Sequence, residues 1–169
     1  MRIEFEKLEE SGGRFAQTYK SLPLDEAELQ LIEPAEVSGR VRRQNGEVEL
    51  RGELHTRVSA PCGRCLKPVE LPIDVRFAER FVPAVAWGDE EQHELQPEDL
   101  NLAVFDGEGI ELDDLVKEEV LLALPGHVLC RPDCRGLCPV CGIDKNEKNC
   151  ECDTKLIDSR WEKLKDLRL

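Results

Sequence analysis

The chain has 169 residues, of which 40% are hydrophobic and 35% are charged, and its formal net charge is −13. This length and composition are typical of one globular domain, or of a core with a small appendage. Such an acidic chain is not a general binder of nucleic-acid phosphates. No apolar run of about 18 residues predicts a membrane span, and the first ten residues lack the basic and apolar regions of a secretory signal. We therefore expect a cytoplasmic protein whose thiols stay reduced.

The first 34 residues show little periodicity: residues 1–8 are compatible with a strand, and residues 24–32 with a short helical turn that ends at Pro34. The next segment is clearer, because apolar and polar residues alternate over 37–42 and 48–58 on either side of Asn45-Gly46. This pattern predicts a β-hairpin with one buried face. Residues 69–77 alternate in the same way, with Pro72 indicating an edge or a bulge. The three runs predict an antiparallel meander.

Residues 83–97 are expected to form a loop, and 102–106 a fourth strand. Residues 110–125 predict a helix that ends at Pro125, since Leu112, Leu115 and Val116 fall on one face. A short helix is expected near the C-terminus, around Trp161. The predicted class is therefore α+β: an antiparallel β-meander or small barrel-like sheet covered by one or two helices, with a cysteine-rich zinc-binding segment. We expect residues 1–125 to form the sheet and helix core and residues 126–169 the metal-binding segment and terminal helix.

The negative charge is concentrated in one central segment. Residues 89–119 carry 13 acids and one Lys, a net charge of −12, whereas residues 1–88 carry −2 and residues 120–169 carry +1. Such a segment is either a solvated acidic surface or a docking surface for a basic partner.

Eight cysteines form four closely spaced pairs, and in a reduced compartment they are expected to bind metal rather than form disulfides. Zinc accepts four thiolates in tetrahedral geometry. The favoured arrangement is one site from Cys138, Cys141, Cys150 and Cys152 and a second from Cys62, Cys65, Cys130 and Cys134. The alternatives are a single zinc with spare thiols, His127 in place of one cysteine, and an iron–sulfur cluster.

Nothing in the sequence predicts catalysis. A catalytic zinc keeps an open position and usually includes His, whereas this chain has more thiols than one site needs and three His in all. A redox Cys-x-x-Cys is expected in a βαβ context, but Cys62 and Cys65 follow a strand of an antiparallel meander. We therefore expect neither enzymatic activity nor a small-molecule substrate.

Several spaced motifs occur in an order that resembles the YceD-like family. They are CGRCLKPV at 62–69, a strand ending in FAERFVP, an acidic linker, LAVFDGEGIELDDLVKEEVLLALP, CRPDCRGLCPVCGIDKNEKNCEC and a DSRW-containing helix. The resemblance covers residues 35–167. Family members are described as large ribosomal RNA subunit accumulation proteins, which implies a role in the synthesis, processing or stability of 23S rRNA. The family has no established catalytic residues, so none is carried over, and its C-terminal cysteines are absent from some branches.

The implied partner is large-subunit rRNA or its precursor, or a basic ribosomal protein that the acidic segment could hold. Residues 40–80 contain nine Lys and Arg against six acids, which makes this sheet face the candidate for RNA contact. The candidate contacts are Arg42, Arg51, His55, Arg57 and Arg76. The alternative for this face is a solvated surface with cross-strand ion pairs. For the whole chain, the alternatives are a zinc-stabilised interaction adaptor in another pathway and, less favoured, a metal-dependent nuclease or thiol redox enzyme.

Overall fold

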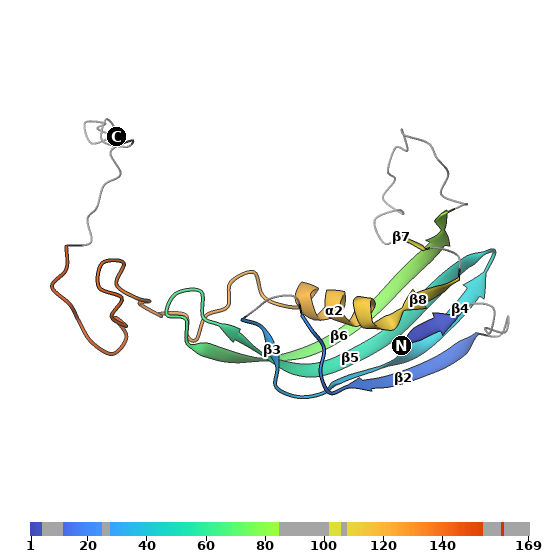
Figure 1. Cartoon of the computed structure of the whole chain (residues 1–169), viewed down its shortest axis with the longest axis horizontal. Coiled ribbons are helices and arrows are strands. Elements are labelled where there is room, and N and C mark those ends of the chain that lie inside the picture. Colours follow the sequence, from blue (N-terminus) through green and yellow to red (C-terminus); the bar gives the residue numbers. More distant parts are fainter. Residues whose placement is uncertain (5–11, 25–27, 85–101, 106–107, 154–159, 161–169) are drawn as a thin grey trace. The chain divides into compact units, whose positions relative to one another are not determined.

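The computed structural model describes residues 1–4, 12–24, 28–84, 102–105, 108–153 and 160. The elements are β1 (Arg2–Glu4), β2 (Gly13–Tyr19), β3 (Gln30–Leu31), β4 (Ala35–Gln44), β5 (Glu47–Pro61), β6 (Pro68–Pro83), β7 (Leu102–Phe105), β8 (Gly109–Glu111) and α2 (Leu112–Leu122). The described part of the chain is therefore mostly β-sheet with one helix, which confirms the α+β class (Figure 1). No helix within these ranges has both the length and the apolar composition needed to cross a bilayer.

The chain divides into two compact units. The first, called here the sheet unit, comprises Met1–Ala60 and Glu70–Gly126. The second, called the cysteine-rich unit, comprises Pro61–Val69 and His127–Leu169. The short segment between β5 and β6 thus belongs with the C-terminal cysteines.

The main sheet has the strand order β2-β4-β5-β6-β7, and β3 pairs with β5 outside that path. The β4–β5 pair is the expected hairpin, in which Asn45 and Gly46 both have positive φ (55° and 86°), as a type I′ turn requires. β7 runs parallel to β6, so the sheet is mixed and not only an antiparallel meander. A parallel neighbour needs a connection of about a dozen residues or more, which the segment 84–101 provides.

The helical turn expected at 24–32 is wrong where the structure describes it. Gln30 and Leu31 form β3 and pair with Ser59 and Val58, and the N–H of Ile32 donates to Arg57 O at 2.8 Å. Pairing with β5 satisfies this backbone and overrides the weak helical preference of the local sequence. The expected terminal helix and most of the expected loop at 83–97 lie outside the described residues.

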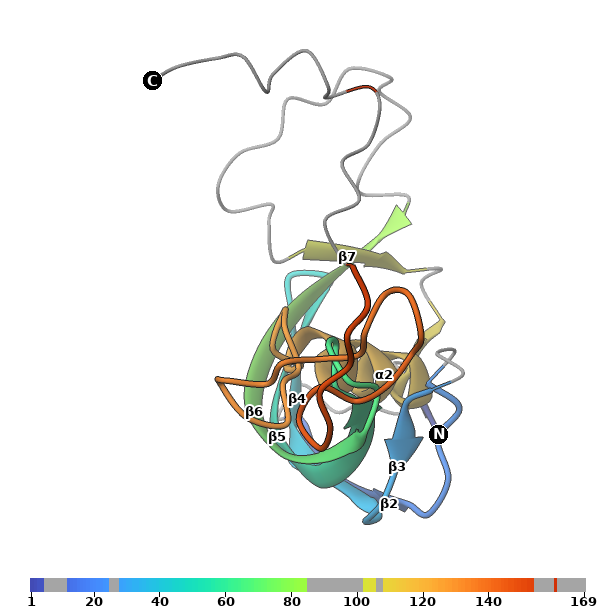
Figure 2. The same ribbon diagram turned by 90° about the vertical axis from the view of Figure 1, so that its left-hand side faces the viewer.

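α2 covers one face of the sheet, and the strands curve around it (Figures 1 and 2). Leu112, Val116 and Val120 are fully buried on its inner face, as the sequence periodicity predicts. They share a core with apolar residues of β4 and β5, including Val37, Leu50, Leu54 and Val58. The hydroxyl of Tyr19 donates to Asp113 Oδ1 at 2.8 Å and joins β2 to the first turn of α2.

Two glycines are direct cross-strand partners in the middle of the sheet, Gly39 on β4 and Gly52 on β5. A Cβ atom at Gly39 would lie 2.6 Å from Phe15 Cζ, and one at Gly52 would lie 2.6 Å from Phe77 Cζ. The two rings therefore occupy the space that side chains at these positions would need, which explains why glycine is required here.

Candidate functional site

The eight cysteines of the cysteine-rich unit lie in two groups. Group A consists of Cys62, Cys65, Cys130 and Cys134, and group B consists of Cys138, Cys141, Cys150 and Cys152. Within each group all four sulfur atoms lie within 4.8 Å of one another. In group A the Cys62–Cys134 sulfurs are 3.9 Å apart and the Cys65–Cys130 sulfurs 3.6 Å apart. All eight thiols are free, because a disulfide requires about 2.05 Å between sulfurs.

These distances fit a tetrahedral metal ion. Four thiolates at about 2.3 Å from a zinc ion stand about 3.8 Å from one another, which lies between the two separations measured in group A. The donor set of each group therefore suits one thiophilic ion, and either group alone supplies four ligands. His127 is exposed and belongs to neither group, so the structure does not support its substitution for a cysteine.

Two turns with the same hydrogen-bond pattern present the Cys-x-x-Cys pairs. In the first, the N–H of Cys62 donates to Lys67 O and that of Leu66 donates to Cys62 O, at 2.8 and 2.9 Å. In the second, the N–H of Cys138 donates to Ile143 O and that of Gly142 to Cys138 O, both at 2.8 Å. Leu66 and Gly142 hold the same place in the two turns, and both have positive φ, 61° and 72°.

Backbone N–H groups, most of them within these turns, favour a thiolate at the first cysteine of each pair. The pKa of Cys62 is lowered to about 6 by the N–H groups of Cys130, Cys65 and Arg64. The pKa of Cys138 is likewise lowered to about 6, by the N–H groups of Cys141 and Val140. Hydrogen bonds that stabilise the charged sulfur are what a metal-binding turn requires, since the thiolate is the ligand.

Polar side chains around the cysteines hold the two turns together. Arg64 Nη1 donates to Cys134 O at 2.8 Å, and Lys67 forms an ion pair of 2.9 Å with Asp144. Asn146 Nδ2 lies 3.4 Å from the Cys134 sulfur and 2.7 Å from Asp144 Oδ1. Such outer contacts orient ligands in metal sites. They also connect the segment that carries Cys62 and Cys65 with the loop that contains group B.

The two groups differ in exposure. Three cysteines of group A are buried and pack with Val69, Leu129 and Leu137. In group B only Cys138 is buried, Cys141 is exposed, and Cys150 and Cys152 are half-buried. Group A is therefore the small core of this unit, whereas group B faces solvent.

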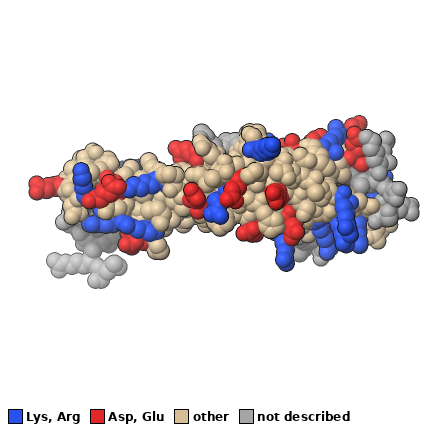
Figure 3. Space-filling model, turned by 90° about the horizontal axis from the view of Figure 1, so that it is seen from below, with Lys and Arg blue, Asp and Glu red and all other residues tan. Residues whose placement is uncertain are grey.

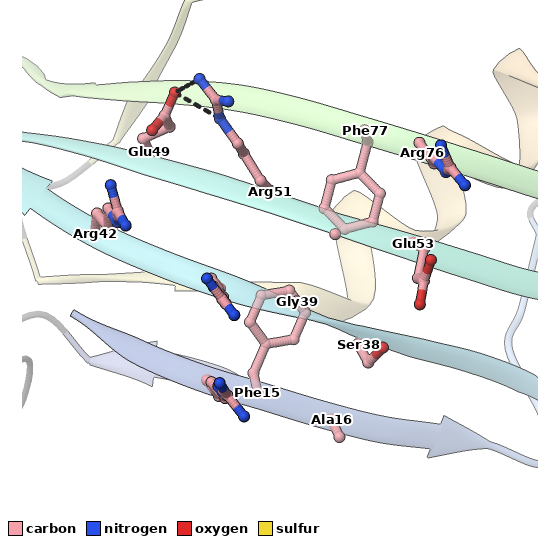
Figure 4. Close-up of a pocket in the computed structure, with 13 residues that line it drawn as sticks. Phe15, Ala16, Ser38, Gly39, Arg42, Glu49, Arg51, Glu53, Arg76 and Phe77 are labelled. Carbon is pink, nitrogen blue, oxygen red and sulfur yellow. Dashed lines mark hydrogen bonds and ion pairs between the residues drawn. The ribbon is translucent and has the colours of Figure 1, made fainter.

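The candidate RNA contacts lie on the outer face of the sheet unit, but the structure separates them into two kinds. Arg42, Arg51 and Arg76 line one open groove (Figure 4). His55 and Arg57 lie outside the groove lining, where His55 pairs with Asp74 at 2.7 Å and Arg57 with Glu33 at 3.2 Å. Figure 3, seen from this side, shows Lys and Arg side chains gathered over one part of the sheet.

Two further arginines line the same groove, Arg14 from β2 and Arg40 from β4. Sequence reasoning missed them because residues 1–34 show no clear alternation and because the pairing of β2 with β4 cannot be read locally. Arg40, however, lies in the alternating run 37–42, where Val37, Gly39 and Val41 form the apolar set. The sequence alone could therefore have predicted that the Arg40 side chain points outward.

A second groove of the sheet unit is acidic. It is lined by Glu79 of β6, Glu111, and Asp114 and Glu118 of α2, beside apolar residues of β7. Burial raises the pKa of Glu79, and the charge of Glu118 raises it further. Part of the negative charge noted in the sequence thus lies around α2.

Comparison with known proteins decides the family. The profile of the family described as "Large ribosomal RNA subunit accumulation protein YceD" matches residues 50–168. The chain belongs to the YceD family. The match includes both cysteine groups, α2 and the strands from β5 onward, but it begins after β2 and β4, which carry Arg14 and Arg40.

The chain is also similar to several bacterial proteins described as uncharacterized. One, from Mycobacterium tuberculosis strain H37Rv, is 35% identical over 125 residues, which cover 74% of this chain and 58% of the relative. The chain thus spans somewhat more than half the length of the mycobacterial relatives. Protein YlbN of Bacillus subtilis is 25% identical over 136 residues, covering 77% of this chain and 74% of YlbN. No solved structure matches the chain.

Proposed function

We propose that this protein is a non-enzymatic ribosome-biogenesis factor, acting in the cytoplasm, that supports synthesis, processing or accumulation of 23S rRNA. The observation that carries the proposal is the family match over residues 50–168, because the family is described by its role in large ribosomal RNA subunit accumulation. The mode of action is binding of the rRNA or its precursor.

The proposed RNA contact is the groove face of the sheet, through Arg42, Arg51 and Arg76. His55 and Arg57 are weaker candidates, because each is already compensated by a carboxylate. A local basic surface is sufficient for contact even though the whole chain carries a charge of −13, since attraction between exposed charges is screened beyond about 8 Å at physiological salt.

The proposed cofactor is zinc, one ion in each cysteine group. Four thiolates suit zinc, and bound metal would stabilise the cysteine-rich unit rather than perform chemistry. Residues 126–169 would then form a metal-held appendage, completed by the Cys62–Cys65 turn. Metal analysis of purified protein, together with thiol titration before and after chelation, tests this part. Two equivalents of zinc and eight protected thiols are expected, whereas redox-active thiols without stoichiometric metal would favour an oxidoreductase.

A basic ribosomal protein is the second candidate partner, and the acidic groove beside α2 favours it. Its carboxylates would attract Lys and Arg, while the apolar residues of β7 offer contact area. This role would make the protein an interaction adaptor of ribosome assembly rather than a direct RNA binder.

The deciding experiment is recovery of bound molecules from cells. A tagged chain, purified under mild conditions, is analysed by sequencing of bound RNA and by mass spectrometry of bound proteins. Enrichment of 23S precursors supports the RNA reading, and enrichment of basic large-subunit proteins without RNA supports the second candidate. If neither class is enriched over an untagged control, the biogenesis proposal fails.

A further inference from the structure

Three arginines stand in a row across the sheet. Arg14 on β2 is the direct cross-strand partner of Arg40 on β4, and Arg40 is the direct partner of Arg51 on β5. Neighbouring strands lie about 4.8 Å apart, so the row extends over about 10 Å. Like charges directly opposite one another destabilise a sheet. Folding alone therefore does not account for this arrangement.

Several other basic side chains of the sheet unit are compensated by carboxylates, although Lys20 and Arg43 form no ion pair within the described ranges either. The ion pairs are His55–Asp74, Arg57–Glu33, Arg80–Glu47 and Arg2–Glu108, at 2.7, 3.2, 2.8 and 3.2 Å. By contrast, Arg14 and Arg40 form no ion pair within the described ranges, and the same holds for Arg42 and Arg76. The chain has 36 acids for 23 Lys and Arg, so carboxylates are not scarce. Two carboxylates line the groove, Glu49 and Glu53, and Glu49 already pairs with Arg51. An external anion would compensate the arginines that have no ion pair.

The neighbouring row leaves space for such an anion. Two residues along from the arginines, Ala16, Ser38 and Glu53 are cross-strand partners, and the first two are short. Both rows line the groove, so the short side chains of Ala16 and Ser38 lie beside the arginines of β2 and β4, whereas Glu53 places a carboxylate at its β5 side. Arg51 is the partly compensated member, because its Nε donates to Glu49 Oε1 at 2.9 Å (Figure 4).

The groove offers charge but no stacking surface. Phe15 and Phe77 contribute to its lining, yet each is only 7% exposed, and their rings pack against Gly39 and Gly52. Sheet surfaces that recognise bases present exposed aromatic rings on which the bases stack. A ligand of this groove would therefore be held through its negative charges.

We propose that the row Arg14–Arg40–Arg51 is a phosphate-binding track that holds consecutive phosphates of an RNA strand crossing β2, β4 and β5. Guanidinium groups bind phosphate oxygens in bidentate fashion, and a row of about 10 Å accommodates more than one phosphate. Binding is independent of base sequence and depends steeply on salt. The choice of RNA over another polyanion rests on the proposed function, whereas the anion track rests on the arginine row itself.

The test measures RNA binding by the zinc-loaded full chain. Fluorescence anisotropy of a labelled 20-nucleotide oligouridylate is recorded from about 50 to 200 mM KCl for the wild type and the double variant Arg14→Gln/Arg40→Gln. Arg2→Gln/Arg80→Gln is the matched control, because it removes the same charge from arginines that already have carboxylate partners. Oligoadenylate and oligocytidylate of equal length test base preference, and unlabelled polyglutamate serves as a polyanion competitor.

We expect the Arg14/Arg40 variant to bind at least about tenfold more weakly at low salt, and its salt slope to fall by about 1.4 for the two lost contacts. Its thermal midpoint should be unchanged or higher, because a like-charge pair has been removed. The control variant should keep wild-type affinity, and the three oligonucleotides should bind within a few-fold of one another.

Four results would overturn the track: equal weakening in both double variants, a fall of the thermal midpoint that accompanies the lost binding, a strong base preference, or competition by polyglutamate as effective as RNA. The last would identify an acidic protein segment as the ligand. This assay uses purified components, so its outcome is separate from the recovery of bound RNA from cells. RNA binding in the assay without recovery of 23S precursors from cells would support the phosphate-binding track and contradict the proposed rRNA function.

Discussion

At the scale of single residues, the two Cys-x-x-Cys turns can be compared directly. Leu66 and Gly142 occupy equivalent places with φ of 61° and 72°, but only glycine adopts this backbone without steric cost. Leu66 is 61% exposed, so packing does little to offset the strain. Neither the local backbone nor packing therefore explains a leucine at this place in the turn.

The exchange of these two residues predicts opposite effects on stability. Leu66→Gly should stabilise the cysteine-rich unit by up to about 1 kcal/mol, because relief of the left-handed strain exceeds the entropy cost of glycine. Gly142→Leu should destabilise it by about 1 kcal/mol or more. No atom lies within 4 Å of a Cβ at this position, so the cost comes from the left-handed backbone conformation and not from a steric clash with neighbours. Urea unfolding at a fixed excess of zinc measures both. Shifts of the same sign would contradict this account of the turn.

At the scale of elements, the helices and strands that are specified by local sequence patterns could be predicted from the sequence. The Asn45-Gly46 hairpin and α2 depend on turn chemistry and on side-chain periodicity within about a dozen residues, and both form. The helix is shorter than the predicted 110–125, because Ile110 and Glu111 pair with β1 as part of β8 and the helix ends at Leu122. The parallel β6–β7 pair, the β1–β8 pair and the β2–β4 register depend on contacts between distant segments. The arginine row belongs to this second kind, because Arg14 and Arg51 come together only through β4. The two cysteine groups could be predicted from the sequence, because closely spaced pairs of cysteines limit how sites of four ligands can be assembled.

The packing of α2 on the sheet buries a carboxyl group and predicts a dependence of stability on pH. Glu119 is 8% exposed, and burial together with the charges of Glu79 and Glu118 raises its pKa above the usual 4.5. The folded state then binds a proton more tightly than the unfolded state, so stability is lost as pH rises from about 4.5 through the raised pKa.

Glu119→Gln should therefore raise the thermal midpoint at pH 7.5, by roughly 2 °C, and the gain should vanish toward pH 4.5 as the wild-type carboxyl becomes protonated. Circular dichroism of both proteins at each pH gives the difference, from which metal effects common to both cancel. Glu118→Gln is the control, because Glu118 is exposed on the same helix and should give a smaller gain. A gain that persists unchanged at low pH would assign the effect to packing rather than to charge.

At the scale of the whole molecule, the two units have cores of different origin. The sheet unit buries a large apolar cluster that includes Leu54, Val58 and Val116. The cysteine-rich unit buries Cys62, Cys65 and Cys134 with only a few partly buried apolar neighbours, too little to order a chain segment without a metal. Metal is thus expected to be required by one unit and dispensable for the other.

Chelation should therefore unfold the cysteine-rich unit and leave the sheet unit folded. Hydrogen exchange read by mass spectrometry, with and without a strong zinc chelator, is expected to show loss of protection in peptides from 61–69 and 127–152, with protection retained over 35–60 and 112–122. Cys138→Ser should reproduce part of the loss and confine it to the region of group B, because group A keeps its four thiolates. Loss of protection throughout β4, β5 and α2 would show instead that the metal-held turns stabilise the sheet, and the two units would then form one cooperative structure.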